Sequence, residues 1–141
     1  MTDFPVTIYH NPDCGTSRNV LAMIEAAGYA PTVIDYRQTG WTREQLERLF
    51  AAIGLPARAM LRDKGTPAAE LRLGDPALSD AALIDAMVAH PILVNRPIVA
   101  TPRGTKLCRP SETVLPLLDR QPDRPDRPDR FVKEDGEIVL P

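Results

Sequence analysis

The N-terminal part of the chain alternates between short β-branched runs and segments whose apolar side chains recur at helical spacing. Residues 6–10 have the pattern of a strand, and residues 15–27 have the pattern of a helix. Residues 32–36 predict a second strand. Thr42 with Gln45 forms a capping-box pattern that predicts the start of a second helix, and Gly54 is predicted to end it. This β-α-β-α order restricts the fold most, because the helices of such a chain must pack against a sheet.

The rest of the chain contains a helical region followed by two further strands. Residues 56–90 contain no convincing strand and predict helical pieces, "PARAMLRD", "PAAELRLG" and "SDAALIDAMVAH", which glycines and prolines separate. The run "RPIVATPRGTKLCRP" predicts two short strands about a Pro-Arg-Gly turn. A final helix is predicted in "PSETVLPLLD", shortened or kinked by Pro116. The second half of the chain is therefore expected to be β-β-α.

These elements predict an α/β fold with one mixed, four-stranded sheet flanked by helices. A helical insertion at about residues 56–90 between a β-α-β half and a β-β-α half is typical of a thioredoxin-like (glutaredoxin-like) fold, although a flavodoxin-like domain also alternates. The length of 141 residues suits one domain, which we place at residues 1–119. Residues 120–130 hold three copies of Pro-Asp-Arg and predict a disordered linker. The tail, residues 131–141, is expected either to pack back as a short strand or to remain loose.

Charge and cysteine content narrow the classes of function. A formal net charge of −2 disfavours binding to nucleic acid. The N-terminus, "MTDFPVTIYH", lacks a signal-peptide pattern and no apolar run in the sequence has the length of a membrane span, so we expect a cytoplasmic protein with no membrane partner. Two cysteines in a reducing cytosol favour a reactive thiol over a structural disulfide. The cysteines and histidines have no recognised metal-ligand spacing, so no metal site is expected.

Cys14 falls at the start of the first predicted helix, and this position favours a thiolate. Unpaired backbone N–H groups and the helix dipole stabilise negative charge at a helix N-terminus and lower the pKa of a cysteine placed there. His10 would add positive charge in its protonated form. The alternative is a buried and inert cysteine, which is the common fate of a free cysteine.

A second thiol is missing from the position where a dithiol oxidoreductase would have it. The motif is Cys14-Gly15-Thr16-Ser17 and not C-x-x-C, so a resolving thiol must come from elsewhere. Cys108 is the internal candidate, but its strand-like surroundings favour a packed core or edge residue. An external thiol such as glutathione is the alternative.

Several ordered segments resemble those of a known family. The segments "HNPDCGTSRN", "ARAMLRDKG", "HPILVNRPIV" and "TKLCRPSE", with "FVKEDGE" near the end, resemble the glutaredoxin-coupled arsenate reductases. The resemblance extends from Val6 to about Leu118. The Pro-Asp-Arg repeat, and a tail that ends soon after "GEIVL", depart from the family pattern.

The resemblance implies a thioredoxin-like core with a helical insertion, and it implies a set of site residues. Cys14 corresponds to the catalytic cysteine, and Arg62, Arg96 and Arg109 correspond to three arginines of the family. His10 corresponds to a histidine that helps to keep the cysteine ionised. By the same resemblance the cysteine attacks arsenate, glutathione serves as second thiol and co-substrate, arsenite leaves, and glutaredoxin restores the thiol, with no bound cofactor.

Electrostatics agrees with this assignment, because guanidinium groups can screen an oxyanion from the thiolate that attacks it. Asn11, Gly15 and Thr16 are candidate substrate-binding residues through their backbone N–H groups, and Asn11 also through its amide; the alternative is that they only form the turn. Arg18 lies one helical turn after Cys14 and is a further candidate for contact with the anion.

Two peptide bonds that precede prolines are candidates for the cis form. Arg96 precedes Pro97 just before the predicted third strand, and a cis peptide there would bring Arg96 close to Cys14 in a thioredoxin-like fold. The bond between His90 and Pro91 could also be cis, but no function requires it.

Three other classes of protein share some features with this sequence. A cysteine phosphatase would need a Cys-x5-Arg loop, and the position six residues after Cys14 is Val20. A monothiol glutaredoxin shares the Cys-Gly-x-Ser element but not the surrounding His-Asn-Pro or the arginine-bearing segments. The stronger alternative is a non-enzymatic thioredoxin-like regulator that binds RNA polymerase, against which the complete "HNPDCGTSRN", "NRPIV" and "LCRP" segments argue.

Overall fold

The computed structural model describes residues 4–119, 131–132 and 138–139. The chain divides into two compact units, one made of Met1–Asp35 with Arg96–Pro141 and the other of Tyr36–Asn95. The first unit contains Cys14 and most of the candidate site residues.

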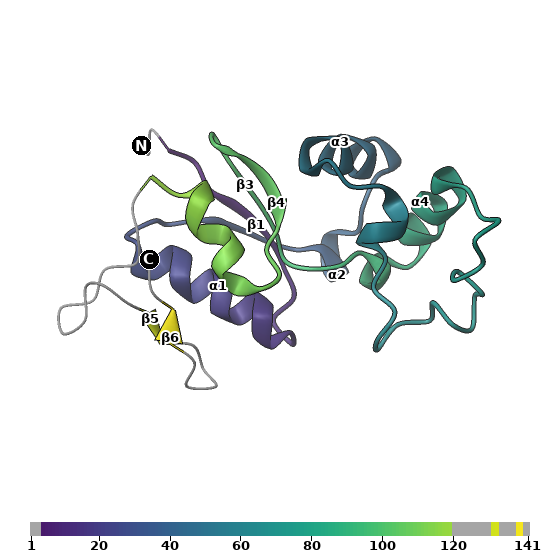
Figure 1. The fold of residues 1–141 in the computed structure, drawn as a ribbon, viewed down its shortest axis with the longest axis horizontal. Helices are drawn as coiled ribbons and strands as arrows, with labels where there is room; N and C mark the ends of the chain where they lie inside the picture. Colours follow the sequence, from purple (N-terminus) through teal and green to yellow (C-terminus); the bar gives the residue numbers. More distant parts are fainter. Residues whose placement is uncertain (1–3, 120–130, 133–137, 140–141) are drawn as a thin grey trace. The chain divides into compact units, whose positions relative to one another are not determined.

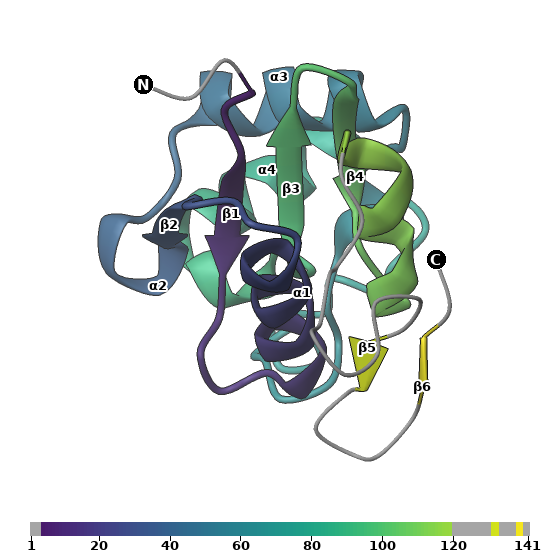
Figure 2. The same cartoon turned by 90° about the vertical axis from the view of Figure 1, so that its left-hand side faces the viewer.

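The first unit (Figure 1) is built on a mixed, four-stranded sheet with the strand order β2-β1-β3-β4, which Figure 2 shows from left to right. β1 (Thr7–His10) pairs in parallel with β2 (Thr32–Asp35) and antiparallel with β3 (Ile98–Thr101), which pairs antiparallel with β4 (Gly104–Leu107). The predicted α/β fold with a mixed four-stranded sheet is therefore confirmed. The strands also agree with the predicted segments, including the turn between β3 and β4.

Two helices lie side by side on one face of this sheet (Figure 2). α1 (Gly15–Ala26) matches its prediction, and the chain turns away from it at Gly28, whose φ of 93° is a left-handed conformation that favours glycine. η3 (Ser111–Leu117) is a 3-10 helix, not the shortened or kinked α-helix that the sequence predicts. Pro116 explains the difference, because it lacks a backbone N–H and its ring clashes with the preceding helical turn.

The core of the first unit is formed between these two helices and the sheet. Its buried residues are Val6, Ile8, Val20, Met23, Ile24, Ala27, Tyr29, Val99, Cys108, Val114, Leu117 and Leu118. The apolar side chains that recur at helical spacing in α1 and at alternate positions in β1 pack in this core. Their packing fixes the end of β1 relative to the start of α1.

The second unit consists of short helices joined by turns. They are α2 (Tyr36–Thr39), α3 (Arg43–Ile53), the 3-10 helix η1 (Ala57–Met60), α4 (Asp80–Ala89) and the 3-10 helix η2 (Pro91–Leu93). The sequence pattern does not predict α2. It predicts that the second strand continues to residue 36, whereas in the structure β2 ends at Asp35 and α2 begins at Tyr36. The predicted helical character of residues 80–90 is confirmed by α4.

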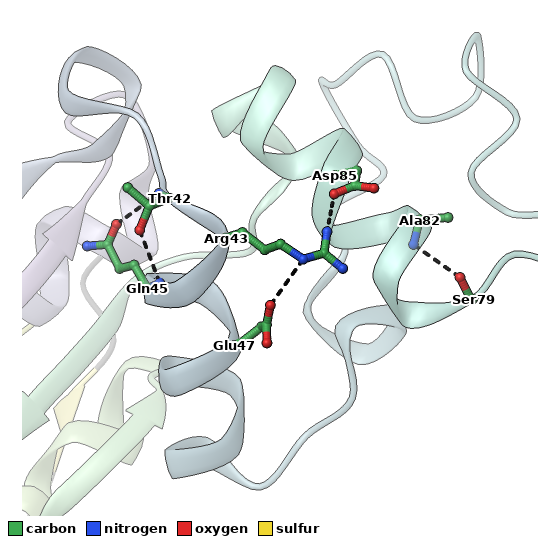
Figure 3. Close-up of polar contacts among 7 residues, drawn as sticks. All are labelled: Thr42, Arg43, Gln45, Glu47, Ser79, Ala82 and Asp85. Atoms are coloured by element: carbon green, nitrogen blue, oxygen red, sulfur yellow. Dashed lines mark hydrogen bonds and ion pairs between the residues drawn. The ribbon is translucent and has the colours of Figure 1, made fainter.

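The ends of α3 follow the sequence prediction closely. The hydroxyl of Thr42 accepts the backbone N–H of Gln45 at 3.1 Å, and the Gln45 side chain accepts the Thr42 N–H at 3.4 Å, which completes the capping box (Figure 3). Gly54 ends the helix with a φ of 83°. Arg43 contacts Glu47 of its own helix and Asp85 of α4, which links the two helices (Figure 3).

Two of the predicted helical pieces in this unit are wrong. The first forms only the 3-10 turn of η1, and residues 67–74 form turns without a helix. In the second of these segments Arg72 has a φ of 58°, a left-handed conformation that a right-handed helix does not contain. Arg58 supplies other partners for this backbone, donating to the carbonyls of Leu73 at 3.4 Å, Asp75 at 2.9 Å and Leu78 at 3.1 Å.

Near the C-terminus, β5 (Phe131–Val132) and β6 (Ile138–Val139) form an antiparallel pair. Residues 120–130, predicted as a disordered linker, lie outside the described residues. In the part of the chain that the structure describes, no helix is long and apolar enough to cross a membrane.

Candidate active site

Cys14 occupies the N-cap of α1, at the end of the short loop that follows β1. Its backbone is extended, with φ −100° and ψ 121°, and its N–H donates to the carbonyl of Asn11 at 3.0 Å. Its own carbonyl accepts the first helical hydrogen bond, from the N–H of Arg18 at 2.9 Å. The prediction that Cys14 lies at a helix N-terminus is therefore confirmed.

The surroundings of Cys14 favour its thiolate form. Burial by itself raises the pKa of the thiol, but hydrogen bonds from the Ser17 backbone N–H and from the guanidinium groups of Arg109 and Arg96 outweigh it, and the charge of Arg109 adds to them. The net result is a pKa below the ordinary value of cysteine. A thiolate at this position is the form that acts as a nucleophile.

Two arginines from distant segments meet at this thiol. Nη1 of Arg109 donates to Sγ of Cys14 at 3.6 Å and to the carbonyl of Arg96 at 3.1 Å. Arg96 is itself buried, with 8% of its surface exposed. One arginine precedes β3 and the other follows β4, so the hairpin brings both to the start of α1. Of the three arginines that the resemblance implies, the structure brings these two to the cysteine.

The backbone at both arginines contains a cis peptide bond. The bond between Arg96 and Pro97 is cis, as the sequence analysis anticipated, and so is the bond between Arg109 and Pro110, which it did not. The bond between His90 and Pro91 is not among the cis bonds.

His10, at the end of β1, and Ser17, in the first turn of α1, form a buried hydrogen-bonded pair. Nδ1 of His10 lies 2.6 Å from Oγ of Ser17, and the same oxygen accepts the backbone N–H of Asn11 at 3.1 Å. The Ser17 backbone N–H is one of the groups that lower the pKa of Cys14. His10 is therefore connected to the cysteine through Ser17.

Ser17 is a site residue that the sequence analysis missed. The signal was present in Cys14-Gly15-Thr16-Ser17, where Ser17 takes the place of the second cysteine of a dithiol motif.

The groups of Asn11 that were predicted to bind an anion are partly used within the loop. Its backbone N–H donates to Ser17, and its Oδ1 accepts the N–H of Asp13 at 2.9 Å. Nη1 of Arg18 donates to the carbonyl of Pro12 at 2.9 Å, so this arginine supports the same loop. These contacts shape the loop; that Asn11 and Arg18 bind substrate stays a prediction.

Gly15 and Thr16 are half-buried in the first turn of α1, which contains no acidic residue. The first N–H groups of a helix have no intrahelical acceptor, so this turn can bind an anion. Substrate binding by these two residues remains a prediction.

Arg62 belongs to the second unit, and three of its hydrogen bonds are to residues of that unit. Its backbone N–H donates to the carbonyl of Leu93 at 2.7 Å, and its Nε donates to the carbonyl of Lys64 at 3.3 Å. The Thr66 hydroxyl donates to the Arg62 carbonyl at 2.7 Å. A catalytic role for Arg62 stays a prediction from the resemblance.

Cys108 differs from Cys14 in the direction of its pKa shift and in its surroundings. It is fully buried in the core of the first unit, and burial raises its pKa to about 12. Its Sγ lies 3.7 Å from the carbonyl of Lys106, as a weak donor. The prediction of a packed core residue is confirmed. Among the described residues, no cluster of three or more His, Cys, Asp or Glu side chains is arranged to hold a metal ion.

Comparisons with known proteins agree on one family. The model of the ArsC family matches residues 9–117. The arsenate reductase ArsI1 of Synechocystis sp. is 59% identical over 140 residues, which cover 99% of this chain and 94% of that protein. The arsenate reductase of Escherichia coli K12 is 53% identical over 96% of this chain and 92% of its own length. A solved structure, an arsenate reductase from Vibrio cholerae, has a TM-score of 0.78 at 47% identity and covers 83% of this chain and 100% of its own.

Proposed function

Because the chain belongs to the ArsC family, we propose that it reduces arsenate to arsenite, with Cys14 as nucleophile, glutathione as second thiol and glutaredoxin as the protein that regenerates the enzyme. Relatives named arsenate reductases are 53% and 59% identical over nearly their whole lengths, which supports the substrate. We expect the reaction to take place in the cytoplasm, where glutathione keeps thiols reduced.

One observation carries the mechanism: the Arg109 guanidinium donates to Sγ of Cys14 at a helix N-terminus. The same charge that stabilises the thiolate also attracts an oxyanion, so the nucleophile and the substrate are held by one set of groups. Arg96, whose guanidinium also hydrogen-bonds the thiol, adds a second permanent positive charge. A thiolate can then approach an anion that would otherwise repel it.

The first chemical step forms a bond between sulfur and arsenic. Sγ of Cys14 attacks the arsenic of arsenate, and one arsenic–oxygen bond breaks with loss of that oxygen as water. Arginine side chains stabilise the negative charge of the remaining oxygens throughout, because a guanidinium keeps its proton at any physiological pH. Arsenic is still pentavalent at this stage.

The second step transfers two electrons to arsenic. The sulfur of glutathione attacks Sγ of Cys14, a disulfide bond forms, and the sulfur–arsenic bond breaks with its electron pair remaining on arsenic. Arsenite leaves, and Cys14 is left in a mixed disulfide with glutathione. Glutaredoxin then takes glutathione from Cys14 by thiol–disulfide exchange.

The state of Cys108 supports the need for an external thiol. Cys108 is the only cysteine of the sequence besides Cys14, and it is fully buried with its pKa raised to about 12. A thiol protonated at neutral pH and closed off from solvent is a poor attacking group. An intramolecular disulfide relay would therefore require a large structural change.

A coupled assay tests the proposal. Purified protein is mixed with arsenate, glutathione, glutaredoxin and glutathione reductase, and oxidation of NADPH is followed. We expect turnover that depends on arsenate and glutaredoxin and is lost in Cys14→Ser. A protein that binds RNA polymerase but gives no arsenate-dependent oxidation would support the non-enzymatic alternative and contradict the proposal.

A further inference from the structure

Ser17 lies at the position where a dithiol site has its second cysteine, and its backbone contacts the nucleophile directly. Cys14 is the N-cap of α1, and Ser17 follows in the first turn of the helix. The backbone N–H of Ser17 hydrogen-bonds the thiol of Cys14. The Ser17 Oγ is joined to this nitrogen through only the Cα and Cβ atoms. The side-chain oxygen of Ser17 is therefore close to the sulfur of Cys14.

The hydroxyl of Ser17 is already used within the protein. Ser17 is fully buried, and its Oγ lies 2.6 Å from Nδ1 of His10 and accepts the Asn11 N–H at 3.1 Å. An aliphatic hydroxyl is also a hard donor, whereas trivalent arsenic is soft and prefers sulfur, as soft metal ions do. Ser17 thus fills the place of the second cysteine with an oxygen that is a poor ligand for trivalent arsenic.

Cys108 does not supply a second sulfur to the site. Cys14 and Cys108 are the two cysteines of the sequence. Cys108 is fully buried among the apolar side chains between the sheet and the helices α1 and η3, and its Sγ lies 3.7 Å from the carbonyl of Lys106. A trivalent arsenic atom bound to Cys14 therefore has a single protein sulfur as ligand.

We propose that Ser17 prevents the enzyme from retaining its own product, because it leaves trivalent arsenic only one sulfur ligand at the site. The inference rests on the proposed function, since arsenite is the product only if the protein reduces arsenate. It assigns to Ser17 a role in product release that is separate from the formation of the thiolate.

The physical basis is the exchange of arsenite hydroxyl groups for thiols. When one thiol binds, an arsenic–sulfur bond forms, an arsenic–oxygen bond breaks, and the hydroxyl leaves as water with the thiol proton, so arsenic stays trivalent. A second thiol of the same protein replaces a second hydroxyl in an intramolecular step. Linking two binding events in this way tightens binding by about 10²–10⁴-fold. A site with one thiol lacks this gain, and arsenite dissociates from it.

Equilibrium dialysis against arsenite tests the proposal. The buffer contains a phosphine reductant and no other thiol, and elemental mass spectrometry gives the arsenic bound per protein. Iodoacetamide labelling of Cys108 in the same samples checks the fold, because this buried thiol becomes reactive when the chain unfolds. The measurement requires neither arsenate nor turnover.

Four variants separate the second sulfur from other effects. Ser17→Cys supplies the sulfur, and Ser17→Ala removes the hydroxyl without adding one. Glu25→Cys is the matched control, because it adds a thiol at an exposed position about 16 Å along α1 from Cys14, too far for one arsenic atom to bridge. Arg18→Cys adds a thiol at an exposed position one turn after Cys14 and leaves the buried Ser17 hydroxyl in place.

We expect Ser17→Cys and Arg18→Cys to lower the dissociation constant of arsenite about 10²-fold or more. Ser17→Ala and Glu25→Cys should remain within about threefold of the unaltered protein, because neither adds a second sulfur within reach. A folded Ser17→Cys variant that binds arsenite no more tightly than Glu25→Cys would overturn the role of Ser17, and so would tight binding by Ser17→Ala.

If Cys108 becomes reactive in Ser17→Cys, Arg18→Cys decides between the same two outcomes with the buried residues unchanged. The proposed function is tested separately by the coupled assay. Absence of arsenate reduction there would contradict the proposed function whatever these dissociation constants are, whereas arsenate reduction without tighter binding of arsenite by the dithiol variants would contradict only the role of Ser17.

Discussion

Nη1 of Arg109 lies 3.6 Å from Sγ of Cys14, although 95 positions separate the two residues in the chain. β4 ends shortly before this arginine, and α1 begins directly after the cysteine. Strand pairing in the sheet and the packing of α1 on it therefore set this contact. The pKa of the thiol depends on the tertiary fold as well as on the helix N-terminus.

Arg109→Ala should raise the pKa of Cys14, because the variant loses a hydrogen bond and a positive charge that favour the thiolate. Only the thiolate reacts with iodoacetamide, so labelling of the unaltered protein persists on acidification until the pH falls through the lowered pKa. In the variant the same loss should occur at higher pH. Arsenate reduction should fall about 10²-fold or more, the effect of removing one preorganised charge-stabilising group.

Arg48→Ala is the control, since Arg48 is exposed on α3 and has no proposed role. It should change neither the labelling profile nor the activity. Arg109→Lys should restore the charge but not the planar pair of donors, and so recover only part of the activity. A labelling profile of Arg109→Ala that matches the unaltered protein would show that the arginine does not support the thiolate.

Cys14 should react with iodoacetamide much faster than Cys108 at about pH 6.5, because its pKa is lowered while burial raises the other to about 12. Peptide mass spectrometry after timed labelling gives both rates. Cys108→Ala should keep most of the arsenate reduction and destabilise the fold modestly, since it leaves a small cavity in the core. An inactive but folded Cys108→Ala variant would favour an internal disulfide relay over glutathione.

Ser17→Ala should lower the free energy of unfolding by about 1–3 kcal/mol, because it removes the buried partner of the His10 ring and of the Asn11 N–H. Urea unfolding measures the loss. Thr39→Ala is the control, since the Thr39 hydroxyl donates to the carbonyl of Gly40 at an exposed position. Its free energy of unfolding should stay within about 0.5 kcal/mol of that of the unaltered protein. Equal stability of the two variants would mean that the Ser17 hydroxyl is not a buried structural link.

Arg58→Ala should destabilise the second unit by about 1–3 kcal/mol, because three carbonyls of the segment after η1 lose their hydrogen bonds to the guanidinium. Hydrogen exchange of the amides in residues 65–79 should increase, which urea unfolding alone would not reveal. Arg48→Ala again provides the comparison, as a change of the same size on an exposed face. Unchanged exchange in this segment would show that other contacts hold it.

Local signals explain the parts of the fold that the sequence predicts well. The capping box of Thr42 with Gln45, and Gly54 at the end of α3, act within a few residues of the helix they bound. The position of Cys14 before α1 is equally local, because β1 and the periodicity of α1 leave only a short loop between them. None of these features depends on contacts between distant segments of the chain.

The features that the sequence analysis missed depend on contacts between distant segments. The turns at residues 67–74 are stabilised by Arg58 from another segment, so their composition alone suggested a helix. The link from His10 to Ser17 requires the end of β1 to meet the first turn of α1. Arg96 and Arg109 could be chosen among the arginines only by resemblance, because nothing in the local sequence distinguishes them from surface arginines.

The central claim is that Cys14 carries the reaction and passes through a mixed disulfide with glutathione. Its most direct test is intact and peptide mass spectrometry after a single turnover with arsenate and reduced glutathione, in the absence of glutaredoxin. We predict one glutathione on the peptide that contains Cys14, formed only when arsenate is present and matched by one arsenite released. Arsenite release accompanied by a disulfide between Cys14 and Cys108, or by no modification of Cys14, would contradict the account.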